Sequence, residues 1–235
     1  MEVLMQLNKV NKIDNNVSVR NILISTADKS GLEYLVKELV SINPEVTIFS
    51  TGGTYELLNR ILEPAHTGVL RKVSEYTGQP EMQGGLVKTL DFKIYLGLLS
   101  EKYNNAHQAD LKRTSAVEID LVVVNLYPFK ETIRKTGGGE TGNNLEDARA
   151  NIDIGGPCML RASAKNFLRV ASVCRPEDYS AVIDELKNNN GALSYSFRYK
   201  LARKSFKHTA EYDSEIASYL FEVDAEQAEK VYSLQ

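Results

Sequence analysis

The chain has 235 residues, of which 43% are hydrophobic and 25% are charged, and its formal net charge is −3. This composition is typical of a globular protein and excludes a disordered chain, a collagen-like repeat and a coiled-coil rod. Such a small net charge gives no electrostatic case for nucleic-acid binding. No apolar run approaches the roughly 20 residues that cross a bilayer, so we expect no membrane segment.

Cysteine and histidine usage limits the chemistry further. Two cysteines, Cys158 and Cys174, are too few for a disulfide framework and favour a reducing cytoplasm. They form no CxxC pair, and the three histidines have no ligand spacing. We therefore expect no metal site.

The first half of the chain alternates apolar strands with helical patterns. Residues 1–18 are polar and predict a loose or partner-bound leader, and residues 21–25 predict a buried strand. Ser30 and Glu33 have the spacing of a capping box, in which the hydroxyl and the carboxylate each accept an amide proton. The helix that follows has an apolar face with helical spacing, made of Leu32, Leu35, Val36, Leu39 and Val40.

Further strands are expected at 46–49, 69–73 and 119–124, the last aliphatic enough to be buried on both faces of a parallel sheet. The rest of the chain predicts a glycine loop at 136–144, helices at 145–151 and 158–167, a strand at 170–173, a helix from Pro176 and a long helix after Gly191. That long helix has one apolar stripe, Phe197, Leu201, Tyr212, Ile216 and Leu220.

This alternation predicts an α/β fold, with a doubly wound, largely parallel sheet and additional C-terminal helices. Ligands of such sheets bind at the carboxyl ends of the strands. The segments expected there are 25–30, 50–54, 86–90, 125–129 and 152–156.

Two glycines within Ser50-Thr51-Gly52-Gly53-Thr54 stand between a strand and a helix. Free amides at a helix start and a close backbone approach suit a phosphate group. A tight turn with a capping threonine is equally compatible with this segment. Lys29, after Asp28, could reach the same phosphate or be an ordinary solvated lysine.

Asp153 lies between two isoleucines and before two glycines. A carboxylate in such apolar surroundings needs a partner, and Lys165 is a candidate. Pairing with Asp153 would tune this lysine for proton transfer. A structural ion pair or a helix cap would explain the same pattern. Asn125 and Tyr127 follow the clearest strand, where they suggest either a polar site or a turn with aromatic packing.

Taken in order, these motifs resemble the inosine monophosphate (IMP) cyclohydrolase domain, the N-terminal half of a bifunctional enzyme that also carries a formyltransferase. The matching segments include Asp28 to Gly31, Ser50 to Thr54, Val87 to Leu90, Asp120 to Phe129, Asn151 to Pro157 and Ala164 to Asn166. The resemblance implies a methylglyoxal-synthase-like fold and a homodimer. It also implies a small nucleotide substrate: formyl-AICAR closes to IMP with loss of water, the last step of purine biosynthesis, without cofactor or metal.

The resemblance also implies residue roles. Lys165 would be the acid and base, poised by Asp153. Lys88, Asn125 and Tyr127 would position the carboxamide or stabilise the oxyanion, helped by amides near Ile154 and Gly155. The nucleotide would be held by Asp28, Lys29, Thr51, Gly52, Gly53, Thr54, Val87 and Thr89.

The chain departs from the family at three places. Leu86 stands where the family usually has an arginine, Asp91-Phe92 where it commonly has His-Pro, and Ala27 where it often has a serine. Losing that arginine removes a bidentate charged contact with the nucleotide.

The expected organisation is a leader at 1–18, one domain at 19–222 and a tail at 223–235. We expect no formyltransferase domain, so a separate formyltransferase would supply the substrate. Two alternatives remain open. One is a methylglyoxal-synthase-type lyase that uses the same phosphate segment. The other is a non-catalytic nucleotide-binding module or partner subunit, which Leu86, Asp91 and Phe92 favour.

Overall fold

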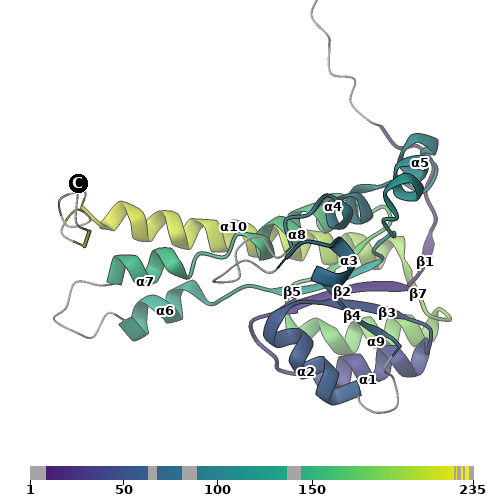
Figure 1. Cartoon of the computed structure of the whole chain (residues 1–235), viewed down its shortest axis with the longest axis horizontal. Coiled ribbons are helices and arrows are strands. Elements are labelled where there is room, and N and C mark those ends of the chain that lie inside the picture. Colours follow the sequence, from purple (N-terminus) through teal and green to yellow (C-terminus); the bar gives the residue numbers. More distant parts are fainter. Residues whose placement is uncertain are drawn as a thin grey trace, which may run out of the picture.

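Five parallel strands form the centre of the chain (Figure 1). The computed structural model describes residues 9–62, 68–80, 89–136, 144–224, 226, 229, 231 and 232. The strands are β2 (Asn21–Thr26), β3 (Thr47–Ser50), β4 (Leu70–Lys72), β5 (Leu121–Asn125) and β6 (Ala171–Val173). They lie side by side in the order β4-β3-β2-β5-β6, which confirms the doubly wound parallel sheet.

Both faces of this sheet are covered by helices, because its strands alternate between two apolar clusters. Ile22 and Ile24 point into one cluster and Leu23 into the other, as the two-residue period of a strand requires. The first cluster includes side chains of α1 (Leu32–Ile42), α2 (Gly52–Leu62) and α9 (Tyr179–Asn188). The second includes side chains of α3 (Val73–Thr77), α4 (Phe92–Leu99) and α8 (Gly155–Lys165).

The longest helix, α10 (Tyr195–Glu222), packs along α8 and β6 and then runs past the sheet, where α6 (Phe129–Thr136) and α7 (Asn144–Ala150) lie nearby (Figure 1). The remaining elements are α5 (Asn105–Thr114) and the 3-10 turn Pro176–Asp178. Among the described residues, no helix is both apolar enough and long enough to cross a membrane.

A second, two-stranded sheet ties the start of the described chain to the start of α10. In it, β1 (Asn16–Ser18) pairs antiparallel with β7 (Ala192–Ser194). The guanidinium of Arg198 is fully buried beside this sheet and donates to backbone carbonyls of Asp14 and Asn15 at 2.9 and 3.0 Å. The same group also donates to the carbonyls of Phe167, Leu168 and Leu193. One side chain therefore joins three separate segments of backbone.

Some local predictions are wrong. The helix starting at Leu32 forms as expected, but its N-cap is Gly31 at φ 69°, and no side chain caps it. The predicted capping box does not form, because the left-handed glycine separates Ser30 from the first turn, and Glu33 pairs with Lys37 instead. Leu220 is 47% exposed and does not share the buried stripe, because that part of α10 lies beyond the sheet.

Candidate functional site

The order of the strands reverses between β2 and β5, which makes their carboxyl ends the expected ligand crevice. Asn125, the last residue of β5, spans this junction. Its Oδ1 accepts from the backbone amides of Ala27 and Asp28 at 2.6 and 2.9 Å, and its Nδ2 donates to the Asp28 carbonyl at 2.8 Å. Asn125 thus lies at the predicted edge, where it holds the loop that leads to Lys29.

An anion-binding geometry lies one strand further, where β3 leads into α2. Gly52 takes a left-handed conformation, φ 48°, and opens α2 directly after Thr51. The ammonium of Lys29 lies 2.6 Å from Thr54 Oγ1 and also donates to the Thr26 carbonyl. Burial lowers the pKa of Lys29. Unpaired amides of a helix start beside a partly buried ammonium suit a phosphate group.

A cavity of about 240 Å³ lies at this point and brings further groups to α2. Its lining includes Ser50, Thr51, Gly52, Tyr55, Lys72 and Ser74. The ammonium of Lys72, the last residue of β4, lies 5.0 Å from the centre of the Tyr55 ring. The predicted segment 50–54 and Lys29 therefore meet in one place, with Lys72 as an additional cation.

The start of α8 forms the second part of the site, built around Asp153. Its Oδ1 accepts from the Gly156 amide at 2.9 Å, and its own amide donates to Tyr212 Oη at 2.7 Å. Burial raises the pKa of Asp153, while backbone hydrogen bonds from Gly156 and Gly155 oppose this shift. The carboxylate thus caps α8, which is one of the interpretations that its sequence pattern allowed.

Close packing at this helix start requires glycine. A Cβ added at Gly155 would lie 2.6 Å from Thr89 Oγ1, so the Thr89 hydroxyl lies against the first turn of α8. A Cβ at Gly156 would lie 2.3 Å from Asp153 Oδ2 and 2.6 Å from a methyl of Leu126. The two glycines let a threonine and a carboxylate approach the helix backbone.

We expect Gly156→Ala to destabilise the fold by about 1–3 kcal/mol, because the new methyl group must displace Asp153 or Leu126. Urea unfolding measures this loss. Gly53→Ala is the matched control: it lies in the first turn of α2, nothing stands within 4 Å of the added Cβ, and stability should be unchanged or slightly higher. Equal stability of the two variants would contradict the close packing at Gly156.

Lys165 does not lie near Asp153. It is the exposed last residue of α8, and eleven residues of α-helix separate the two ends by about 16 Å. Asn166 and Arg169, which follow it, donate to the carbonyls of Leu98 and Ile119 near the amino end of β5. The predicted contact between Asp153 and Lys165 is therefore wrong within one chain, because the helix between them places them at opposite edges of the sheet.

The other predicted residues divide into two groups. Tyr127 follows β5 and is 56% exposed, and Ile154 at the start of α8 is 59% exposed, so both are accessible from solvent. Lys88, Val87 and Leu86 lie outside the described residues. Tyr212, which accepts a hydrogen bond from the Asp153 amide, belongs to the predicted stripe of α10. No local sequence pattern indicates this contact, because 59 residues separate the two partners.

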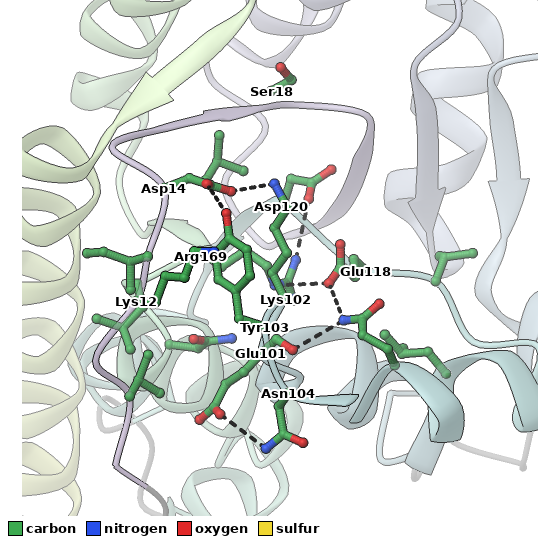
Figure 2. A pocket seen from close by; sticks show the side chains of 18 of the residues that line it. Lys12, Asp14, Ser18, Glu101, Lys102, Tyr103, Asn104, Glu118, Asp120 and Arg169 are labelled. Atoms are coloured by element: carbon green, nitrogen blue, oxygen red, sulfur yellow. Dashed lines mark hydrogen bonds and ion pairs between the residues drawn. The ribbon is translucent and has the colours of Figure 1, made fainter. Parts of the chain in front are cut away.

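A larger cavity, about 800 Å³, lies at the amino edge of the sheet, beneath residues 9–21 (Figure 2). Several of its charged side chains pair with one another. Asp14 accepts from Lys102 at 2.5 Å and from Tyr103 at 2.6 Å, and Arg169 lies 3.4 Å from Asp120. None of the described candidates from the sequence lines it. We therefore place the functional site at the carboxyl edge.

Two family models match successive parts of this chain. The family model of MGS-like domains matches residues 31–158, and that of the AICARFT/IMPCHase bienzyme matches residues 163–235. The bifunctional purine biosynthesis protein PurH of Trichormus variabilis is 46% identical over 198 residues, which are 84% of this chain and 37% of that protein. PurH of Neisseria gonorrhoeae is 46% identical over 86% of this chain and 36% of its own length.

The chain thus spans little more than a third of the length of these relatives. A solved structure described as "Crystal structure of ForH" has a TM-score of 0.68 and 28% identity, and the match covers 85% of this chain and 98% of that one. The MGS-like match covers the starts of α2 and α8, and the second match covers Tyr212, while Lys29 lies just before the first match. The chain belongs to the family of MGS-like domains, and its last third matches the AICARFT/IMPCHase bienzyme family.

Proposed function

We propose that this chain is an IMP cyclohydrolase, which closes formyl-AICAR to IMP with loss of water in purine biosynthesis. The observation that carries the proposal is the placement of two helix starts, those of α2 and α8, at one edge of the sheet. The first helix follows β3 and the second packs against β5; β2 lies between these two strands, and the two helices cover opposite faces of the sheet. An extended nucleotide can therefore place its phosphate at one helix and its base at the other.

The phosphate end of the substrate belongs at α2. There, the amides of the first turn, the Thr51 hydroxyl and the ammonium of Lys29, which Thr54 holds in place, form a set of donors. Asp28 and Asn125 keep the preceding loop in place, since Asp28 Oδ1 accepts from the Ser30 amide at 2.8 Å and Asn125 holds the loop backbone. Such preorganised donors bind an anion without further ordering of the chain.

The reacting end belongs at α8. The carboxamide nitrogen attacks the formyl carbon and loses one proton, while charge builds on the formyl oxygen. The formamido nitrogen then loses its proton as it forms the C=N bond, and the oxygen, having taken up two protons, leaves as water. The amides at Ile154 and Gly155 and the Thr89 hydroxyl, all in or against the first turn of α8, are the groups we propose to stabilise the charged oxygen. Asp153, whose pKa is raised by burial, is the group we propose for the proton transfer, a contribution of about 10²–10⁴-fold. Lys88 and Tyr127 are proposed to orient the carboxamide.

The direct test is to incubate the purified chain with formyl-AICAR and to follow IMP formation, with Asp153→Asn as the negative control. We expect turnover by the wild-type chain that exceeds the rate in buffer and falls in the variant. A chain that binds IMP without turnover would instead be a nucleotide-binding module, a possibility favoured by the position of Lys165 at the far edge. For the compartment of this reaction we propose the cytoplasm, in keeping with free Cys158 and Cys174.

Lys29→Met should weaken substrate binding and leave the chemical step almost intact. Removing one charged contact to the phosphate costs about 1.5–3 kcal/mol, so we expect KM to rise by roughly 10–100-fold with little change in kcat. Steady-state kinetics separates the two constants. Lys37→Met, an exposed lysine on α1 paired with Glu33, is the matched control and should leave both unchanged. A fall in kcat alone would contradict phosphate binding by Lys29.

A further inference from the structure

The cavity of about 240 Å³ opens onto the start of α2 from the side of β4, and Lys72 is the one cation among the described residues that line it. Lys72 ends β4 and stands in register with Ser50, the last residue of β3. Lys29 reaches the same helix start from the opposite side, because it follows β2, the other neighbour of β3. The two lysines therefore flank the start of α2.

The ammonium of Lys72 is held beside the cavity but has no charged partner there. It lies 5.0 Å from the centre of the Tyr55 ring, which is within the range of a cation–π contact. Glu56 also lines the cavity, yet no carboxylate of the described residues forms an ion pair with Lys72. The donors of this ammonium therefore remain free for a ligand.

The charge of a phosphate monoester calls for a second cation. Because its second pKa is about 6, such a group carries roughly 1.5 to 2 negative charges at neutral pH. The ammonium of Lys29 balances one of these charges. A half-buried cation on the other side of the same helix start can balance the rest, and attraction between opposite charges is stronger in a cavity than in open water.

We propose that Lys72 is a second phosphate-binding cation, and that the phosphate of the substrate lies between Lys72 and Lys29 at the amides that open α2. This inference rests on the proposed function for the identity of the substrate, whereas the pair of cations itself requires only a phosphate monoester. Tyr55 is a positioning residue, since its ring acts on the ligand through the ammonium of Lys72.

Titration calorimetry of the full chain with IMP and with inorganic phosphate tests this assignment. Lys72→Met removes one charged contact, so both ligands should bind about tenfold more weakly. In the turnover assay, KM should rise by a similar factor with little change in kcat. Arg71→Met is the matched control, because it removes the same charge from the exposed neighbour on β4, whose side chain points to the other face of the strand. It should leave both affinities unchanged.

Two variants of Tyr55 test its positioning role without changing any charge. Tyr55→Leu removes the ring beside the ammonium and should weaken phosphate binding about threefold. Tyr55→Phe keeps the ring and should retain most of the affinity. Equal losses in these two variants would contradict the role of the ring.

The outcomes separate this assignment from the cyclohydrolase proposal. Wild-type turnover, together with an unchanged phosphate affinity of Lys72→Met, would overturn the assignment and leave the proposed function standing. A tenfold loss of phosphate affinity in Lys72→Met, without turnover by the wild-type chain, would support the assignment and contradict the proposed function. A wild-type chain that binds neither IMP nor phosphate, or an Arg71→Met variant as weak as Lys72→Met, would overturn the assignment.

Discussion

Asp153→Asn is expected to lower kcat for IMP formation by about 10²–10⁴-fold while leaving the fold intact. Asparagine keeps an oxygen that can accept from the Gly156 amide, at present 2.9 Å from the carboxylate, so the cap of α8 is preserved. The substitution removes the ability of this side chain to gain and lose a proton. The measurement is kcat with formyl-AICAR, together with the melting temperature.

Asp153→Ala is the informative comparison, because it removes both the proton-transfer group and the cap. We expect its kcat to match that of Asp153→Asn and its stability to fall by a further ~1 kcal/mol. If asparagine retained wild-type turnover and alanine alone lost it, Asp153 would be a helix cap without a role in the chemistry.

The pH dependence gives a second readout of the same group. Burial raises the pKa of Asp153 above its ordinary value of 3.8, so the folded chain binds this proton more tightly than the unfolded chain does. The free energy of unfolding therefore falls as the pH rises through the pKa of the folded state, and it stays lower at higher pH. Asp153→Asn should remove this dependence from urea unfolding curves measured between acid and neutral pH. It should also flatten the acid limb of the rate profile.

Arg198→Met is expected to lower the free energy of unfolding by about 3 kcal/mol. The fully buried guanidinium donates to five backbone carbonyls in three segments, and methionine leaves these acceptors unpaired away from water. Burial lowers the pKa of Arg198 to about 10, because removal from water disfavours the charged form of the guanidinium. Urea unfolding followed by circular dichroism measures the loss.

Two further variants separate the role of Arg198 from a general effect on α10. Lys200→Met changes an exposed residue two positions away and should stay within about 0.5 kcal/mol of wild type. Arg198→Lys keeps a charge but cannot span all the carbonyls, so an intermediate loss is expected. Limited proteolysis should cut near residues 14–18 sooner in Arg198→Met, because these residues lose their attachment. Unchanged cleavage there would contradict the role of Arg198 in holding the N-terminal strand.

The sequence by itself determined the main elements and indicated the edge of the sheet where the candidate site lies. Period and composition were sufficient because strands such as β5, buried on both faces, must be continuously apolar, and because the helix at Leu32 shows its buried face as a regular stripe. The segment that we propose to bind phosphate could be singled out for a related reason. Glycines directly between a strand and a helix have few roles other than letting a backbone or an anion approach.

Only the tertiary structure decided which of the candidates meet. Asp153 and Lys165 are twelve residues apart, but a straight helix separates them by its full length, and no pattern of residue types carries that distance. In the same way, Tyr212 reaches the Asp153 amide only because α10 packs along α8. Arg198 joins Asp14 and Asn15 to α10 across more than 180 residues. Contacts between distant segments depend on how helices pack on the sheet, and a single sequence records the local preferences of each segment but not that packing.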